Sequence, residues 1–128
     1  MNDTIVTPYQ LLGGAEPLRR LVDRFYDLMD SAPEARELRA MHGADLAPMR
    51  DKLFDFMSGW LGGPALYAQR TGSVCITRAH QPFPIDAAAR DQWLWCMQRA
   101  LADVDAPAEM RAMVTQPLER MADFLRNR

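Results

Sequence analysis

The sequence lacks the cysteine pattern and the glycine fingerprint that mark several common kinds of functional site. Its two cysteines, Cys75 and Cys96, do not have the CxxC spacing of metal or redox pairs. We expect both to be buried or partly buried free thiols rather than a disulfide. No GxGxxG stretch marks a flavin or nicotinamide site. Any redox function would therefore need electrons from another protein.

The sequence also lacks an excess of one charge and a long apolar run. Its formal net charge is −2, and acidic and basic residues are interspersed rather than gathered into a basic stripe, so we expect no nucleic-acid partner. No apolar run approaches the length of a membrane span. The amino end, Met1–Val6, is too short and too polar for a signal sequence. We expect a cytoplasmic protein without membrane contact, in which residues 1–6 form a flexible N-terminus.

Apolar periodicity predicts a single all-α domain over residues 1–128. The chain is 48% hydrophobic and has 128 residues, enough for one core and too few for two domains of ordinary size. Apolar residues recur at spacings of three and four in four long stretches, residues 16–29, 45–61, 86–104 and 107–125. Strand-like alternation of useful length and internal repeats are both absent from the sequence.

Proline, glycine and capping residues set the expected helix ends. Thr7-Pro8 should open a short helix that Gly13-Gly14 closes. Asp45 and Asp86 are predicted N-caps of long helices. Pro117 is predicted to kink the last helix, because proline removes one backbone donor and crowds the preceding turn. Further short helices are expected at residues 34–41, at residues 65–70 and immediately before His80.

His80 is the first candidate for a functional residue. It precedes a Pro-Phe break, so its helix should end there and leave the imidazole at a helix terminus. Imidazole is a common iron ligand, which makes His80 a candidate axial ligand of haem. Taken alone, a single histidine beside apolar residues is more often a hydrogen-bonded core or surface residue.

Five separated motifs follow one another along the chain. They are Tyr9-Gln10-Leu11-Leu12-Gly13-Gly14, Arg24-Phe25-Tyr26, Gly59-Trp60-Leu61-Gly62-Gly63-Pro64, His80-Gln81-Pro82-Phe83 and Asp91-Gln92-Trp93. In this order and spacing they resemble the group II truncated haemoglobins of the bacterial globin family, over nearly the whole chain. The resemblance implies a two-over-two helical sandwich around haem b, present as a monomer or weak homodimer.

The resemblance also implies a role for each matching residue. His80 corresponds to the proximal iron ligand, and Tyr26 and Trp93 to residues that face the bound ligand on the distal side. His42 falls at the corner before the distal helix. The remaining matches are the gate residue Met49, the apolar residue Leu53 over the iron, and the haem-packing residues Phe56, Met57 and Phe83. Met49 is larger than the residue commonly found at its position and could narrow ligand entry.

Haem propionates need cationic or hydroxyl partners at the rim of a pocket. Lys52, the only lysine in the chain, precedes Leu53 and can reach from an apolar face to a carboxylate. The family commonly has an arginine immediately before the proximal histidine, whereas Ala79 stands there in this chain. Arg78, one place earlier, is the expected substitute, with a solvated surface role as its alternative.

The distal residues predict slow release of dioxygen. Bound dioxygen carries partial negative charge, and Tyr26, Trp93 and His42 can each offer an O–H or N–H to it. Each also has a plainer alternative: Tyr26 and Trp93 could fill the core, and His42 could cap a turn. We expect reversible binding of dioxygen, nitric oxide and carbon monoxide at ferrous iron, with nitric oxide or peroxide detoxification supported by an external reductase.

Two other functional classes remain open from the sequence. The nine methionines could form the adaptable apolar face of a cofactor-free helical interaction module. A haem-based sensor or electron carrier is the third possibility, in which Tyr26 or His42 would bind the iron directly. The colour of the purified protein separates the first alternative from a haem protein.

Overall fold

The computed structural model describes residues 6–73 and 76–128, and within these ranges every regular element is a helix. This agrees with the all-α class predicted from apolar periodicity. The helices in chain order are α1 (Pro8–Leu12), α2 (Ala15–Ser31), the 3-10 turn η1 (Pro33–Ala35), α3 (Arg36–Ala40), α4 (Ala47–Trp60), α5 (Leu66–Thr71), α6 (Thr77–His80), α7 (Ala87–Asp103) and α8 (Ala108–Phe124).

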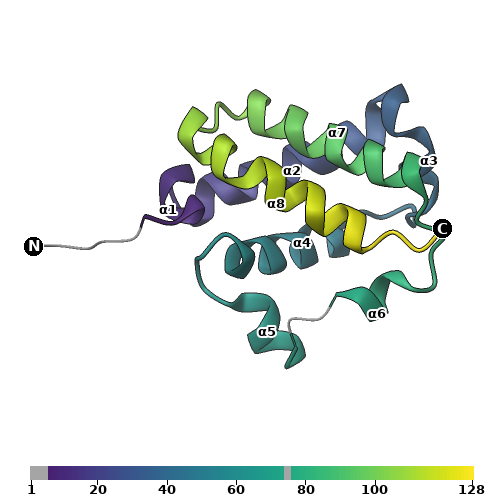
Figure 1. Ribbon diagram of the computed structural model, residues 1–128, viewed down its shortest axis with the longest axis horizontal. Coiled ribbons are helices and arrows are strands. Elements are labelled where there is room, and N and C mark those ends of the chain that lie inside the picture. The colour runs from purple at the N-terminus through teal and green to yellow at the C-terminus, as the bar shows by residue number, and fades with distance from the viewer. Residues whose placement is uncertain (1–5, 74–75) are drawn as a thin grey trace, which may run out of the picture.

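Four long helices form the body of the molecule. Helix α2 packs against both α4 and α7, and α7 packs against α8 (Figure 1). Fully buried side chains of α2, α7 and α8 form the centre of the core, among them Leu18, Phe25, Met97, Leu101 and Met110. In Figure 1 the short helices α5 and α6 lie below α4, away from α7 and α8. They therefore extend the fold on one side of α4.

Two of the sequence motifs meet where α1 joins the end of α4. The backbone N–H of Tyr9 donates to the carbonyl of Leu61 at 3.0 Å. Gly62 has a φ of +94°, a conformation that side-chain-bearing residues rarely adopt. A Cβ on Gly63 would lie 2.5 Å from the Tyr9 ring. The Gly62-Gly63 pair is therefore required for α1 to dock, which explains why the two motifs occur together.

The predicted helix ends agree with the structure at Asp86 and differ from it at Asp45. The Asp86 carboxylate caps α7 by accepting the backbone N–H of Ala89 at 2.9 Å. Asp45 is not the N-cap of α4, because the helix starts two residues later with Leu46 in the cap position. The Asp45 carboxylate instead accepts the N–H of Ala47 at 3.0 Å. Helix α8 continues on both sides of Pro117.

The two cysteines and the N-terminus were also subjects of sequence predictions. Cys96 is a free, fully buried thiol as expected, and its burial raises its pKa to about 11. Cys75 and residues 1–5 lie outside the described residues. None of the helices that the structure describes is long and apolar enough to cross a membrane.

Candidate functional site

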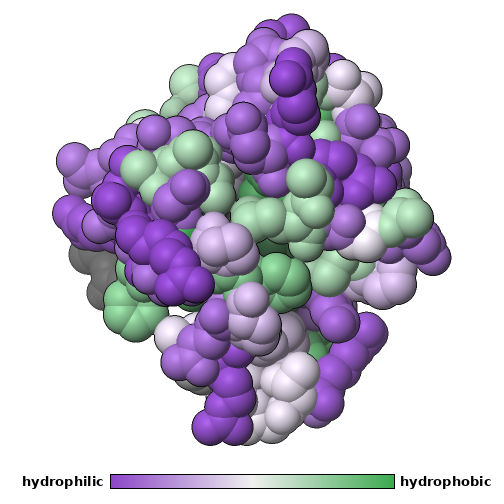
Figure 2. All heavy atoms as spheres, turned by 90° about the vertical axis from the view of Figure 1, so that its right-hand side faces the viewer, coloured by the Kyte–Doolittle hydropathy of each residue, from purple (hydrophilic) through white to green (hydrophobic). Residues whose placement is uncertain are grey.

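A largely apolar cavity of about 390 Å³ lies among the long and short helices. Side chains from α2, α3, α4, α5, α6, α7 and α8 line it. Figure 2 views the molecule from the side on which α3, α6 and the end of α8 lie, and hydrophobic residues surround a central hollow there. The cavity brings together nine residues expected at a ligand site: Tyr26, His42, Met49, Lys52, Leu53, Phe56, His80, Phe83 and Trp93.

Two expected pocket residues lie outside the lining of this cavity. Met57 is 1% exposed and belongs to the hydrophobic core instead of the cavity wall. It follows Phe56 on α4, and one helical step turns its side chain by about 100° away from the lining face. Arg78 is exposed on the short helix α6. Their expected roles in packing and propionate binding therefore have no support in the structure.

His80 is oriented by a hydrogen bond from its own helix. It is the last residue of α6, and the chain turns away through Gln81 and Pro82. Its Nδ1–H donates to the carbonyl of Ile76 at 2.7 Å. A carbonyl oxygen can only accept, so this bond selects the tautomer in which Nε2 carries a lone pair. In the neutral ring, Nε2 is therefore the nitrogen of His80 that can bind a metal.

Tyr26 and Trp93 are hydrogen-bond donors that line the same cavity as His80. Within the part of the chain that the structure describes, neither the Tyr26 hydroxyl nor the Trp93 indole N–H has a hydrogen-bond partner. Tyr26 is 4% exposed, and burial raises the pKa of its hydroxyl well above the ordinary value, with a smaller opposing effect from Arg50. Both groups therefore remain neutral donors available to a ligand.

Aromatic packing fixes the direction of these two donors. The ring of Phe25 contacts Tyr26 edge-on at 5.0 Å and lies 5.3 Å from the ring of Trp93. Phe25 is itself fully buried in α2. Because closely packed side chains change rotamer only at a cost in packing, Phe25 holds both donors in place.

His42 has a different hydrogen-bonding role from the one expected. Its Nδ1 lies 2.8 Å from the carbonyl of Leu38, so the neutral ring must place its proton on Nδ1. Nε2 is then an acceptor and cannot donate to a bound ligand. The ring lies edge-on to Tyr26, with 6.3 Å between centroids. With a neutral His42 ring, the cavity thus offers a bound ligand two donors, Tyr26 and Trp93, and one acceptor, His42 Nε2. The sequence had predicted three donors.

Gln92 of the Asp91-Gln92-Trp93 motif and Arg39, which the sequence did not single out, hold His42 at the corner. The backbone N–H of Leu38 donates to Gln92 Oε1 at 3.0 Å, while Gln92 Nε2 donates to Glu37 at 2.6 Å. Arg39 donates to the carbonyl oxygens of Gly43 at 3.0 Å and Ala44 at 3.3 Å. These bonds connect α7 to α3 and α3 to the corner that follows it.

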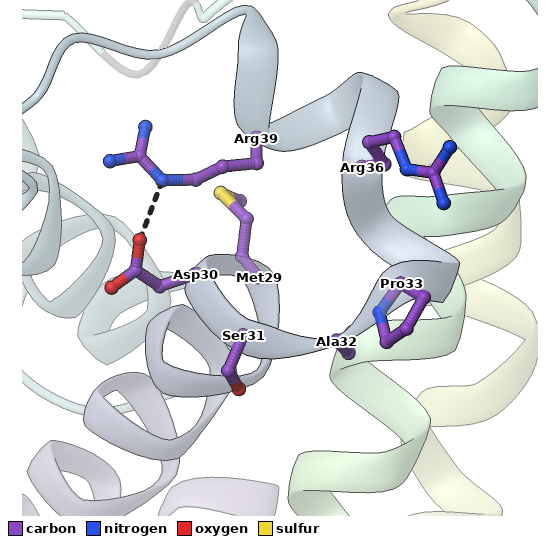
Figure 3. Close-up of a pocket in the computed structure, with 7 residues that line it drawn as sticks. All are labelled: Met29, Asp30, Ser31, Ala32, Pro33, Arg36 and Arg39. Carbon is purple, nitrogen blue, oxygen red and sulfur yellow. Dashed lines mark hydrogen bonds and ion pairs between the residues drawn. The ribbon is translucent and has the colours of Figure 1, made fainter.

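A second, more open pocket at the end of α2 does not gather charge into a binding site. Figure 3 shows Arg36 and Arg39 at opposite sides of this pocket with their guanidinium groups pointing apart. Arg39 Nε donates to the Asp30 carboxylate at 2.8 Å. Arg39 is therefore committed to fixing the corner, and the pocket lacks convergent cations for an anionic ligand.

Among the described residues, two side-chain cations line the main cavity, and one of them has no ion pair. Arg90, which the sequence did not single out, pairs with Asp123 at 2.7 Å and with Asp91 at 3.1 Å. Lys52 is exposed at the cavity and has no ion pair or hydrogen bond among the described residues. Lys52 is thus the free cation at this site, whereas Arg90 joins α7 to α8.

The donor set suits a macrocyclic metal cofactor better than a bare ion. Within residues 6–73 and 76–128 no group of three or more His, Cys, Asp or Glu side chains could hold a metal. A single imidazole nitrogen, an apolar cavity and a cation at its edge match what haem needs: one axial ligand, apolar contacts and a propionate partner. Tyr67, which packs edge-on to Phe56 at 5.8 Å, adds an aromatic wall that the sequence did not indicate.

Comparisons with known proteins agree with this geometry. The model of the bacterial-like globin family matches residues 7–127. The group 2 truncated hemoglobin YjbI of Bacillus subtilis is 34% identical over 99% of this chain and 93% of its own length. The group II 2-on-2 hemoglobin from Agrobacterium tumefaciens superposes with a TM-score of 0.92 at 40% identity, covering 99% of this chain and 98% of that one. A truncated oxygen-avid haemoglobin from Bacillus subtilis gives a TM-score of 0.87 at 34% identity, covering 95% and 100% of the two chains.

Proposed function

Because this chain belongs to the bacterial-like globin family and has the two-over-two fold of its group II truncated haemoglobins, we propose that haem b binds in the cavity with His80 as its axial ligand. The family supports haem-based binding of small gaseous ligands. The observation that carries the proposal is the placement of His80 in the same cavity as two unpaired donors, Tyr26 and Trp93. Ferrous haem would supply reversible binding of dioxygen, nitric oxide and carbon monoxide.

The protein's own residues would slow the release of dioxygen. The Tyr26 hydroxyl and the Trp93 indole N–H can both donate to the negative charge that dioxygen develops on binding. Each such bond contributes about 0.5–1.5 kcal/mol net. Since 1.36 kcal/mol corresponds to about a factor of ten, two bonds slow release by roughly five- to 160-fold. The similar haemoglobin from Bacillus subtilis is described as oxygen-avid, which suits this expectation.

Slow release favours oxygen chemistry over oxygen delivery. The leading reaction is the conversion of nitric oxide to nitrate, in which dioxygen, nitric oxide and one electron give one nitrate ion. An external reductase must supply that electron, because the sequence has no flavin or nicotinamide fingerprint. The same donors could polarise a bound peroxide. We place this activity in the cytoplasm, in a monomer or weak homodimer.

Nitric oxide consumption under air tests this reaction. The reduced, haem-loaded protein should convert added nitric oxide to nitrate in equal amounts, and should turn over repeatedly when a reductase and its electron donor are present. The His80→Ala protein treated in the same way is the control. If the loaded wild-type protein forms no nitrate beyond that control, the detoxification role is wrong while the binding role can stand.

Lys52 gives a second prediction, because it is the free cation at the cavity. If it pairs with a haem propionate, Lys52→Ala should speed haem loss by about twofold to fivefold, the range for an exposed ion pair worth up to about 1 kcal/mol. Haem transfer to excess apomyoglobin measures the rate. Raising the salt concentration should narrow the difference, because salt screens exposed ion pairs.

Arg36→Ala is the matched control for Lys52→Ala. Arg36 is also exposed and cationic, but it lies at the other pocket, so haem loss from this variant should match the wild type. Equal haem loss from the wild type, Lys52→Ala and Arg36→Ala would remove Lys52 from the propionate site.

A further inference from the structure

The short helix that carries His80 needs support from elsewhere in the fold. Helix α6 has only four residues, far below the length at which a helix is stable in water by itself. His80 is its last residue, and the hydrogen bond from His80 to Ile76 lies within the same stretch of chain. That bond sets the tautomer of the ring but cannot fix the position of α6 relative to the cavity.

The other end of the chain provides this support through Asn127. Its Nδ2 donates to the carbonyl of Phe83 at 2.9 Å and, more weakly, to that of His80 at 3.4 Å. Its Oδ1 accepts the backbone N–H of Ile85 at 2.9 Å, and its own N–H donates to the carbonyl of Ile85 at 2.9 Å. The side-chain amide therefore binds both backbone carbonyl oxygens and a backbone N–H between His80 and Ile85.

These contacts are the main polar attachment of this segment. Among the described residues, the hydrogen bonds that join residues 80–85 to another part of the chain all go to Asn127 or Arg128. The helix that leads to Asn127 is α8, which contributes Met121 and Ala122 to the cavity lining, as does Leu125 immediately after it. Asp123 of α8 also pairs with Arg90 of α7 at 2.7 Å. The segment after His80 is thus tied to a helix that is itself anchored beside the cavity.

We propose that Asn127 is a positioning residue for the proximal histidine, an inference that rests on the proposed ligation of iron by His80. The side-chain hydrogen bonds of Asn127 go to the backbone of His80, Phe83 and Ile85 and not to the imidazole. By holding the carbonyl oxygens of His80 and Phe83 and the N–H of Ile85, it fixes the end of α6 and so the distance and tilt of the imidazole. Loss of the amide would let this end move and weaken the bond between imidazole and iron.

Replacement of Asn127 by alanine tests the proposal on the haem-loaded protein. The rate of haem loss to apomyoglobin should rise by at least about fourfold, because each lost hydrogen bond changes an equilibrium by roughly two- to tenfold and two good side-chain bonds disappear. The iron–histidine stretching band in the resonance Raman spectrum of the ferrous protein should move to lower frequency or broaden. Amide exchange at Ile85 should also quicken.

Gln116→Ala is the matched control. Gln116 is an exposed side-chain amide on α8 whose oxygen accepts a hydrogen bond from Arg120 of the same helix at 3.4 Å, so its loss should change neither haem loss nor the Raman band. Faster haem loss from Asn127→Ala with an unmoved Raman band and a lower urea midpoint would show a merely structural role and overturn the proposal. Wild-type values of the haem-loss rate, the Raman band and amide exchange at Ile85 in Asn127→Ala would also overturn it.

The failure of this inference can be distinguished from the failure of the proposed function. If the wild-type protein shows no iron–histidine band, the ligation by His80 is wrong and the proposal falls with it. If the band is present and Asn127→Ala leaves it unchanged, His80 remains the ligand and only the positioning role is lost.

Discussion

Replacing His80 with alanine is expected to abolish stable haem binding. In the neutral ring its Nε2 carries the lone pair, since Nδ1–H donates to the carbonyl of Ile76 at 2.7 Å. Loss of a partner that merely orients a ligand typically costs 10- to 100-fold in metal affinity, so loss of the ligand itself should speed haem loss by at least about 100-fold. Haem transfer to excess apomyoglobin, followed at the Soret band, measures this rate.

His42→Ala is the matched control for this experiment, because it removes the other histidine of the chain from the same cavity. This variant should retain its haem. Added imidazole should restore haem binding to His80→Ala if the variant is folded and lacks only the ligand. Full haem content and a wild-type spectrum in His80→Ala would contradict the assignment.

Replacing Trp93 with phenylalanine is expected to speed the dissociation of dioxygen by about threefold to tenfold, the effect of losing one hydrogen bond in a sheltered pocket. Tyr26→Phe should have an effect of the same order. The double variant should combine the two increases, unless the donors share one ligand oxygen and therefore couple. Stopped-flow mixing of the oxygenated protein with carbon monoxide measures these rates.

Trp95→Phe provides a matched control on the same helix. Trp95 lies on α7 but does not line the cavity, so its replacement should leave the oxygen off-rate unchanged. Carbon monoxide develops less negative charge than dioxygen when it binds, so its dissociation should change less in Trp93→Phe. Equal acceleration for both gases would indicate an altered shape of the pocket, and an unchanged oxygen off-rate would remove Trp93 as a donor.

Much of the fold could be predicted from local sequence patterns. The apolar period predicted the four long helices, and Asp86 was predicted as the cap of α7. Asp45 was wrong as a cap because α4 starts at Ala47 with Leu46 in the cap position, and the Asp45 carboxylate accepts the N–H of Ala47, the first helical residue. A sequence pattern shows that a residue can cap, but the start of the helix depends on the preceding turn.

The candidate site was predictable to the extent that it depends on helix faces. Leu53 and Phe56 share the face of α4 that lines the cavity, whereas Met57 turns into the core. Phe56 and Met57 both fall within the broad apolar stripe of α4, so the sequence could not show which of them lines the cavity. The pairing of Arg90 with Asp123, across two helices, was equally hidden.

Hydrogen bonds between distant residues account for what sequence patterns missed. The acceptor role of His42 depends on the carbonyl of Leu38, whose peptide is in turn held by Gln92. Asn127 contacts the segment after His80 across more than 40 residues of chain. Neither relation has a local signal, because both arise only when helices that are distant in the sequence pack together.

A visible absorption spectrum of the purified wild-type protein tests the central claim most directly. It should be recorded as isolated or after reconstitution with haem, after reduction, and after addition of dioxygen or carbon monoxide. The account predicts a Soret band that shifts with each ligand. A band that does not respond to either gas would indicate an electron carrier or a sensor whose iron is closed by a residue of the protein, and no haem uptake after reconstitution would contradict the account.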